Sequence, residues 1–271
     1  MNESSTNRPV AVITGSTSGL GEEFANRLAG DGYDLLLVAR RTALLEKQKA
    51  ELETNFNIQV DIMSVDLADS EQLLQLEQRV ASLDRLEFLV NNAGFGFENK
   101  FPDTDLALEC QMLQVHAIAP LRLIYAALSP MVRRKKGFII NVASVAAYLY
   151  GPACAQYMAT KAYLLSLSKC LQCDVKEYGI EIQALCPGFV RTGFHSAKLM
   201  DEEKFKKMPG FLWLNRKSVV NESLQNIRRK RRSTVCVPSW RYKFFLAILT
   251  CPLFNCVTEI IYRQRAKMGD K

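Results

Sequence analysis

A tyrosine and a lysine four residues apart could carry acid/base chemistry in this chain. Tyr157 and Lys161 lie in a segment of helical character, where this spacing places both side chains on one face with Cβ atoms roughly 5–6 Å apart. A free tyrosine titrates near ~10, so an ammonium fixed beside it would favour the phenolate and lower the pKa. Ser144 follows the apolar run 138–142, and its hydroxyl could hold a carbonyl oxygen while the tyrosine protonates it. A surface pair that matches by chance is the alternative for the tyrosine and lysine taken alone.

A glycine-containing loop separates the short β-branched run 9–14 from a segment of helical character, 22–29. Its candidate binding residues are Gly15, Ser16, Ser18, Gly19, Leu20 and Gly21. Glycines let the backbone approach a pyrophosphate, and the following helix N-terminus offers free N–H groups and the positive end of the helix dipole. With the apolar run 33–39 as a second strand, this order predicts a dinucleotide-binding βαβ unit.

Two arginines, Arg40 and Arg41, end that second strand. A dinucleotide-binding fold carries an acidic residue at about this place if it binds a ribose 2′-hydroxyl. An arginine offers instead a planar fork for a 2′-phosphate. The pair therefore favours NADP(H) over NAD(H), and two solvated arginines at a strand end are the alternative.

Helical and strand-like segments continue to alternate along the chain. We expect helices near 42–55, 69–82, 104–132, 153–177 and 218–232, and strands at 58–65, 86–90, 138–142, 180–186 and 234–237. Repeated βα units of this length predict an α/β fold, in which a doubly wound parallel sheet carries helices on both faces. Pro120 predicts a kink or a break inside the segment 104–132.

Polar or glycine-containing segments follow several of the predicted strands. They are Asp66-Leu67, Asn91-Asn92-Ala93-Gly94 and Pro187-Gly188-Phe189-Val190-Arg191-Thr192. In open α/β sheets, ligands bind at the carboxyl ends of the strands. The irregular segment that follows, 189–215, contains several aromatic side chains and is expected to form a lid over the substrate.

Length and composition suit one large α/β domain with a full core: the chain has 271 residues, of which 48% are hydrophobic. Residues 1–8 are polar and lack the apolar core of a signal peptide, so we expect a disordered tail and a cytoplasmic protein. The eight cysteines stand mostly among apolar neighbours, which predicts buried thiols and leaves Cys170 and Cys173 as the one suggestive redox pair. The two histidines, His116 and His195, are far apart without a neighbouring carboxylate cluster, so no protein-bound metal is expected.

The basic balance of the chain leaves several anionic partners open. A formal charge of +7 and a pI near 9.0 are compatible with a phosphorylated cofactor, nucleic acid or an anionic membrane surface. The basic run 228–232 could bind nucleic acid or lipid, but a solvated helix end is the simpler interpretation, and no nucleic-acid partner is expected. The apolar extension 239–271 is expected to form a broken helix packed on the domain. A membrane span, disfavoured by Glu259, and peripheral membrane contact are the alternatives.

Together these motifs resemble those of the short-chain dehydrogenase/reductase family, in family order over roughly residues 9–195. The matching positions are Thr14-Gly15-x-x-x-Gly19-Leu20-Gly21, Asp66-Leu67, Asn91-Asn92-Ala93-Gly94, Ser144, Tyr157-x-x-x-Lys161 and Pro187-Gly188. The strand end Ala39-Arg40-Arg41 is similar to that of NADP-dependent ketoreductases in the family, some of which act on acyl chains or steroids. The resemblance implies a Rossmann-like domain, 9–238, with a seven-stranded parallel sheet, a small-molecule carbonyl or alcohol substrate, and a homo-oligomer, either a dimer or a tetramer.

The resemblance also implies a role for each catalytic residue. Ser144 would position the carbonyl oxygen, and Tyr157 would give it a proton. Lys161 would hold the nicotinamide ribose and depress the pKa of the tyrosine. Proton transfer from an aligned group of this kind contributes on the order of 10²–10⁴ in rate.

For the cofactor, the resemblance implies contacts along the whole carboxyl edge of the sheet. Asp66, with Leu67 beside it, would meet the adenine edge, and Asn92 to Gly94 would line the adenosine ribose. Pro187 to Thr192, which includes Val190, would surround the nicotinamide.

His116 departs from the family pattern. Family members usually have an asparagine at the position that we align with His116, where it anchors a water that passes protons to the lysine. A histidine could hold this water through a ring nitrogen, and its pKa near ~6.5 would then add a pH dependence. A packing substitution that weakens the relay is the alternative, and we hypothesise that His116 preserves the relay.

The sequence thus predicts an enzyme that reduces a moderately apolar ketone or aldehyde with NADPH in a reversible hydride transfer. The alternative is a sensor or scaffold protein that keeps the fold and binds NADP(H) without catalysis. The intact set of Ser144, Tyr157 and Lys161 argues against it, because a pure sensor has no evident use for all three. A third possibility places the same chemistry on membrane lipids through the C-terminal extension.

Overall fold

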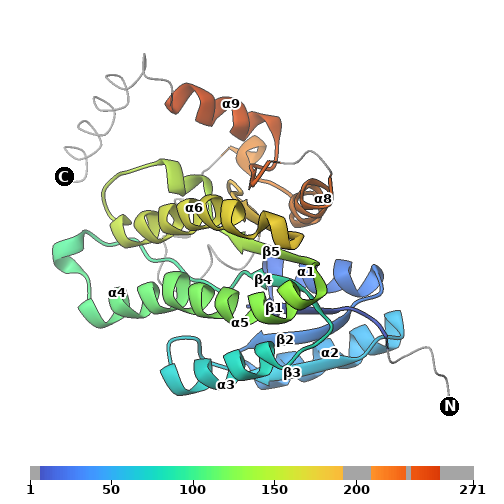
Figure 1. Cartoon of the computed structure of the whole chain (residues 1–271). Helices are drawn as coiled ribbons and strands as arrows, with labels where there is room; N and C mark the ends of the chain where they lie inside the picture. The colour runs from blue at the N-terminus through green and yellow to red at the C-terminus, as the bar shows by residue number, and fades with distance from the viewer. Residues whose placement is uncertain (1–6, 192–208, 230–232, 251–271) are drawn as a thin grey trace.

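Parallel strands run through the centre of the molecule with helices on both sides (Figure 1). The computed structural model describes residues 7–191, 209–229 and 233–250. The described strands form one seven-stranded sheet in the order β3-β2-β1-β4-β5-β6-β7, and every neighbouring pair is parallel. The predicted doubly wound α/β fold is confirmed.

The first half of the sheet is built by alternating strands and helices. These are β1 (Val10–Thr14), α1 (Gly19–Gly30), β2 (Asp34–Ala39), α2 (Thr42–Phe56), β3 (Val60–Ser64), α3 (Ser70–Ala81) and β4 (Leu86–Asn91). The sheet order then steps back across β1, so the chain crosses from one half of the sheet to the other after β3. A switch of this kind opens a crevice at the carboxyl ends of β1 and β4.

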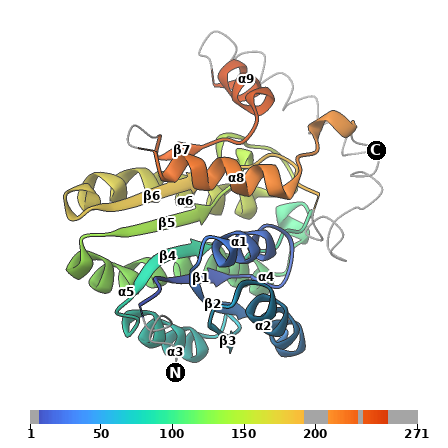
Figure 2. The same ribbon diagram turned by 90° about the vertical axis from the view of Figure 1, so that its right-hand side faces the viewer.

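The second half follows the same alternation with longer helices. Its elements are α4 (Leu106–Leu113), a π-helical segment η3 (Gln114–Ile118), α5 (Ala119–Arg134), β5 (Gly137–Val142), a short 3₁₀ turn η4 (Val145–Tyr148), α6 (Ala155–Val175), β6 (Ile180–Leu185), α8 (Arg216–Ile227), β7 (Val235–Cys236) and α9 (Trp240–Leu249). In Figure 2, α1 and α8 lie side by side over one face of the sheet.

Among the described residues, the two largest apolar cores lie on opposite faces of the sheet. One contains side chains of α1, α2 and α8, and the other contains side chains of α3 and α5. Phe88 on β4 is fully buried in the first core, where its ring stacks on Phe138 with centroids 4.7 Å apart and meets the ring of Tyr33 edge-on at 5.4 Å. Burial on both faces explains why the strands read as nearly continuous apolar runs.

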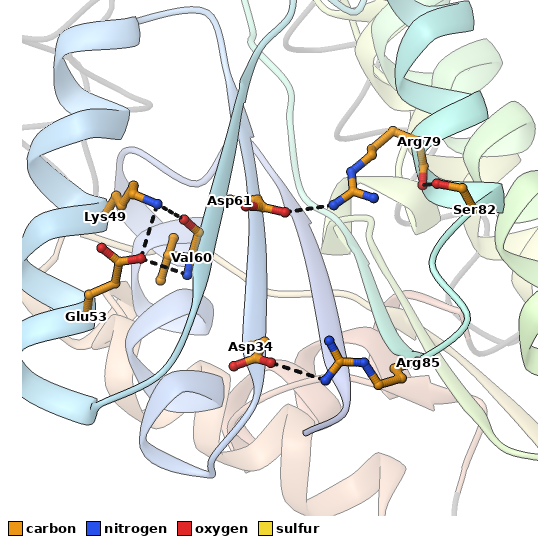
Figure 3. Close-up of polar contacts among 8 residues, drawn as sticks. All are labelled: Asp34, Lys49, Glu53, Val60, Asp61, Arg79, Ser82 and Arg85. Carbon is orange, nitrogen blue, oxygen red and sulfur yellow. Dashed lines mark hydrogen bonds and ion pairs between the residues drawn. The ribbon is translucent and has the colours of Figure 1, made fainter. Parts of the chain in front are cut away.

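One edge strand of the sheet, β3, is contacted by side chains of neighbouring helices (Figure 3). Glu53 on α2 accepts the Val60 N–H at 3.1 Å, and Lys49 donates to the Val60 carbonyl. On the other side, Arg79 of α3 pairs with Asp61 at 2.7 Å. An edge strand with such partners is a poor template for pairing with another chain.

The predicted break near Pro120 takes the form of the π-helical segment. Pro120 stands at the start of α5 and has no N–H to donate to the carbonyl four residues earlier, that of His116. The helical turn is one residue wider there, because the Ala119 N–H donates to the carbonyl of Gln114, five residues earlier. The helix expected over 104–132 is therefore one continuous helical stretch, Leu106–Arg134, interrupted by a π-helical segment that contains His116.

Three expectations need correction. The helix expected over 218–232 ends at Ile227, where the Arg228 N–H caps the Leu224 carbonyl, and the last strand is only Val235–Cys236. The cysteines are not uniformly buried: those at 110, 170 and 173 are exposed, because they lie on the outer faces of α4 and α6. The cysteines at 251 and 256 lie outside the described residues.

One described helical stretch is long and apolar enough to cross a membrane, namely Leu106–Arg134. Its most apolar window is 61% buried inside the domain, which is the position of a core helix. Of the C-terminal extension, the structure describes α9, which packs on the domain through Tyr242 and Leu246. The residues from 251 onward lie outside the described part of the chain.

Replacing Phe88 with alanine should lower the free energy of unfolding by about 3–5 kcal/mol, because the aromatic contacts are lost and a cavity remains. Chemical denaturation measures this change. Leu74→Ala on α3, whose side chain is 45% exposed, is the control and should cost less than about 1 kcal/mol. Equal losses in the two variants would show that Phe88 is not central to the core.

Candidate active site

The carboxyl end of β1 is fastened to the carboxyl end of β4. The Thr14 hydroxyl accepts the N–H groups of Asn92 and Ala93 at 3.0 and 3.1 Å, and donates to the Val90 carbonyl at 3.3 Å. The Asn92 side-chain amide donates to the carbonyls of Thr14 and Gly15 at 3.0 and 3.1 Å. Asn92 therefore holds the glycine loop in place, in addition to the ribose contact that the family resemblance implies for it.

The glycine loop has the shape that a pyrophosphate needs. Gly15 and Gly19 adopt positive φ angles of 65° and 61°, which favour glycine. A Cβ on Gly21 would lie 2.2 Å from the Gly15 carbonyl oxygen, so this position excludes every larger residue. The helix α1 begins at Gly19 without a side-chain cap from Ser18, which leaves its first N–H groups for an anion.

Two further features of the loop fit a bound dinucleotide. The Ser16 hydroxyl oxygen is buried and has no hydrogen-bond partner among the described residues, as expected for a group that meets a ligand. Leu20 is buried in the core, so only its backbone can face the ligand.

Arg40 and Arg41 are both exposed at the end of β2. The guanidinium of Arg41 donates to the Thr17 hydroxyl at 3.1 Å, which places it beside the glycine loop. The Arg40 carbonyl accepts the hydroxyl of Ser64, at the end of β3. The position of Arg41 fits the 2′-phosphate of NADP(H), since that phosphate lies near this loop in a dinucleotide-binding fold.

Other predicted cofactor residues that the structure describes lie at the same edge. Asp66 follows β3 and accepts the Ala68 N–H at 3.0 Å through Oδ1, while Leu67 is buried in the core. Gly94 lies against His116, because a Cβ there would be 2.9 Å from Nε2 of that ring. The Pro187 carbonyl accepts the Val145 N–H at 3.0 Å, which joins the turn after β6 to the segment after β5.

Ser144, Tyr157 and Lys161 are brought together beside this edge. Ser144 follows β5 in an extended conformation at the N-cap of η4, and its oxygen accepts the Ala146 N–H at 3.1 Å, so the hydroxyl proton is left for another acceptor. A hydrogen bond joins Ser144 to Tyr157. The ammonium of Lys161 lies 5.6 Å from the centroid of the Tyr157 ring and donates to the Val142 carbonyl at 2.9 Å. The predicted spacing on one helix therefore produces a real cluster.

The expected lowering of the tyrosine pKa is wrong for the protein's own groups. Burial raises the pKa of Tyr157 to about 12, and the hydrogen bond with Ser144 opposes this rise. Burial also lowers the pKa of Lys161 to about 8. Desolvation disfavours the charged form of both groups, and it is the largest cause of both shifts.

Tyr242 is a contributor that the sequence did not reveal. Its hydroxyl, on α9, accepts the Phe189 N–H at 3.1 Å and donates to the Leu212 carbonyl at 2.7 Å. A Cβ on Gly188 would lie 2.0 Å from its ring, so the tyrosine packs directly on the turn expected to surround the nicotinamide. An aromatic residue in an apolar tail carries no signal for such a contact.

The segment expected as a lid is described only at its two ends. Val190 and Leu214 form a parallel β-bridge, and the Leu214 N–H donates to the Phe189 carbonyl at 2.7 Å. Thr192, a predicted cofactor residue, and His195 lie outside the described residues.

Comparison with known proteins agrees with this geometry. A family model for the short chain dehydrogenases matches residues 9–203. The chain belongs to the short-chain dehydrogenase family. This confirms the relationship inferred from the motifs, and the match extends into the segment expected as a lid, 189–215.

Curated relatives within the family are reductases of acyl chains by name. The chain is 35% identical over 191 residues to a fatty acyl-CoA reductase of Acinetobacter baylyi, covering 68% of this chain and 63% of that protein. It is 30% identical over 187 residues to the very-long-chain 3-oxoacyl-CoA reductase of Homo sapiens, covering 67% of this chain and 59% of that protein. The matches thus span less than two thirds of these relatives.

Solved structures of the family share the whole fold. A short-chain dehydrogenase from Sphingobium yanoikuyae in complex with NADPH has a TM-score of 0.80 and 28% identity, covering 88% of this chain and 92% of that one. The bulky-bulky ketone specific alcohol dehydrogenase from Comamonas testosteroni has a TM-score of 0.76 and 25% identity, covering 98% and 96%.

His116, which stands where the family usually has asparagine, has a protein hydrogen-bond partner at each of its two ring nitrogens. It is 1% exposed. Its Nε2 accepts the Phe95 N–H at 3.0 Å, so Nδ1 carries the proton and faces the Thr160 hydroxyl at 3.2 Å. That hydroxyl donates to the Tyr157 carbonyl at 2.9 Å. The hypothesis that a ring nitrogen holds a relay water is therefore wrong, because both nitrogens already have protein partners.

The contacts of His116 instead join the turn after β4 to the catalytic helix α6. Burial and the nearby Lys161 ammonium lower the pKa of His116 well below 6.5. The ring is therefore neutral near pH 7, and it adds no ionisation to the active site there.

In His116→Asn, the free energy of unfolding should fall less steeply at acid pH than it does in the wild type. Below pH 6.5 the unfolded chain binds a proton at His116 that the folded chain does not, so the wild type loses about 1.4 kcal/mol of stability for each pH unit below that value. Denaturation at pH 5, 6 and 7 should show a steeper loss for the wild type than for the variant. Parallel pH profiles of stability would contradict a neutral, buried His116.

Proposed function

We propose that the protein is an NADPH-dependent reductase that converts the ketone of a 3-oxoacyl thioester to an alcohol. The observation that carries this proposal is the cluster of Ser144, Tyr157 and Lys161 at the carboxyl edge of the sheet, beside a glycine loop of cofactor-binding shape. Hydride transfer needs a donor, a proton source and a group that orients the carbonyl, and this edge offers a place for each.

NADPH is the proposed hydride donor. The buried Ser16 oxygen, which has no partner in the described part of the chain, fits a phosphorylated dinucleotide, as do the start of α1 without a side-chain cap and the exposed Arg41. The similarity to a family member in complex with NADPH supports the same cofactor.

The proposed substrate class rests on the names of the relatives together with the surface beside the site. The relatives are reductases of acyl-CoA and 3-oxoacyl-CoA, and the related alcohol dehydrogenase is specific for bulky ketones. Beside the turn at Pro187, the rings of Phe189 and Trp213 lie 5.9 Å apart, and Phe211 is 63% exposed. These side chains offer an apolar surface for an acyl chain, and the net charge of +7 favours an anionic carrier.

In the proposed mechanism, bound NADPH supplies a hydride to the carbonyl carbon. The hydroxyl of Ser144 is held by the Ala146 N–H and donates its proton toward the carbonyl oxygen. Because its pKa is about 12, Tyr157 is protonated at neutral pH and can give its proton to the same oxygen. Lys161, with a pKa of about 8, can restore that proton. These protonation states favour the reductive direction.

The sensor or scaffold alternative does not account for this cluster. Holding Lys161 in a buried position with a lowered pKa costs folding free energy. A protein that only binds the cofactor gains nothing from this cost. Homo-oligomerisation and a cytoplasmic location stay predictions. Peripheral membrane contact also stays a prediction. The exposed side chains of Trp240, Phe244 and Phe245 on α9 are consistent with it.

Tyr157→Phe should reduce turnover by on the order of 10²–10⁴, because the proton donor is removed. NADPH affinity should change little, since the ring itself remains. NADPH oxidation with acetoacetyl-CoA measures turnover, and quenching of protein fluorescence measures cofactor binding. Tyr178→Phe, at an exposed tyrosine after α6, is the matched control. Retained activity in Tyr157→Phe would refute the mechanism.

Arg41→Ala should raise the KM for NADPH about tenfold or more and leave the KM for NADH nearly unchanged, because a charged hydrogen bond to the 2′-phosphate is worth about 1.5–3 kcal/mol. Steady-state kinetics with both cofactors test this. The control is Arg133→Ala, which removes an exposed arginine paired with Asp84 on another part of the surface. An equal rise in KM for both cofactors would exclude recognition of the 2′-phosphate by Arg41.

A further inference from the structure

A small cavity lies between α4 and the start of the catalytic helix α6. Its lining includes Phe97, Phe101, Glu109, Met112, Cys154 and Tyr157. Its volume of about 10 Å³ is close to the minimum that one water molecule requires. The Asn99 N–H donates to the Ala153 carbonyl at 3.0 Å, which fastens together two segments of the cavity wall.

Glu109 brings an unsatisfied carboxylate to this cavity. The residue is 6% exposed, and its Oε2 is buried without a hydrogen-bond partner among the residues that the structure describes. A buried polar atom of this kind costs free energy unless a donor reaches it. The lining also contains the side-chain amides of Asn99 and Gln156, but no described group donates to Oε2, so a ligand in the cavity would supply the missing donor.

The start of α6, in contrast, needs hydrogen-bond acceptors. The first N–H groups of a helix have no acceptor within the helix. Cys154 occupies the N-cap position but provides no side-chain cap, and its φ and ψ of −152° and 36° lie outside the extended region that capping residues adopt. Ala153 before it has a positive φ of 66°, a strained conformation for a residue other than glycine. The side chain at the N-cap position thus contributes no hydrogen bond to the start of α6.

We propose that the cavity binds one water molecule, which donates to Oε2 of Glu109 and accepts an N–H from the first turn of α6. Water suits the site because it both donates and accepts, and because the volume is close to that of one water molecule. The negative charge of Glu109 near a helix N-terminus adds a favourable interaction with the helix dipole. Glu109 and this water together act as the cap that Cys154 does not provide.

The cap makes Glu109 a positioning residue for Tyr157, which lies in the first turn of α6 and also lines the cavity. Farther along the helix, Thr160 is bonded to His116 and Lys161 to the Val142 carbonyl. The water would fix the remaining, N-terminal side of the helix. Loss of alignment of a proton donor lowers the rate of chemistry more than it lowers cofactor affinity. This kinetic consequence rests on the proposed function, whereas the water site does not.

The test compares Glu109→Gln with Glu109→Ala. The amide oxygen of glutamine can still accept from the water, so Glu109→Gln should keep kcat within about threefold of the wild type. Glu109→Ala removes the acceptor and should lower kcat about tenfold or more, with NADPH affinity unchanged within about twofold, for a lost hydrogen bond to a charged group. Glu71→Ala, at an exposed glutamate on α3, is the matched control and should behave as the wild type.

Two readouts are independent of activity. A high-resolution crystal structure of the wild type should show an ordered water within hydrogen-bond distance of Oε2. Hydrogen exchange of the amides of residues 155–157 should be faster in Glu109→Ala than in Glu109→Gln. A dry cavity, or equal exchange in the two variants, would overturn the proposal even if the protein reduces ketones as proposed. If Glu109→Ala does not fold, the crystal structure and the kcat of Glu109→Gln decide the matter, and a tenfold loss in Glu109→Gln would also overturn it.

Discussion

The burial of the Lys161 side chain is the constraint around which the site is organised. The residue is 5% exposed, and its nitrogen donates to the carbonyl of Val142, the last residue of β5. A cationic group in the interior must keep a hydrogen bond, and the strand end offers an acceptor whose position the sheet determines. This hydrogen bond fixes the position of α6 relative to the end of β5. Tyr157, one turn before the lysine, is thereby placed beside Ser144.

The same burial determines the protonation states that the chemistry uses. Desolvation raises the pKa of Tyr157 and lowers that of Lys161, so near neutral pH the tyrosine is an acid and the lysine can release a proton. A site with these states is suited to giving a proton to a newly formed alkoxide. The neutral His116 takes no part in this titration, and its hydrogen bonds to Phe95 and Thr160 serve to hold α6.

Much of the fold could be predicted from the sequence, because βα alternation, the glycine loop and the Tyr157–Lys161 spacing are local patterns. The pKa directions could not, because they depend on how deeply the docked helix is buried. The partners of His116 and the contact between Tyr242 and Gly188 join segments far apart in the chain. Sequence spacing gives no measure of such contacts. The end of α8 at Ile227 could not be predicted either, because the basic run that follows is compatible with a continued helix.

We propose that this edge of the sheet moves a hydride from NADPH to a ketone. The most direct test supplies the wild type with acetoacetyl-CoA and NADPH carrying deuterium at nicotinamide C4, in two separate preparations that differ in the labelled face. Mass spectrometry of the alcohol should find deuterium on the carbinol carbon with one preparation and none with the other. Alcohol formed without deuterium from either preparation, or no consumption of NADPH with any ketone tested, would contradict the account.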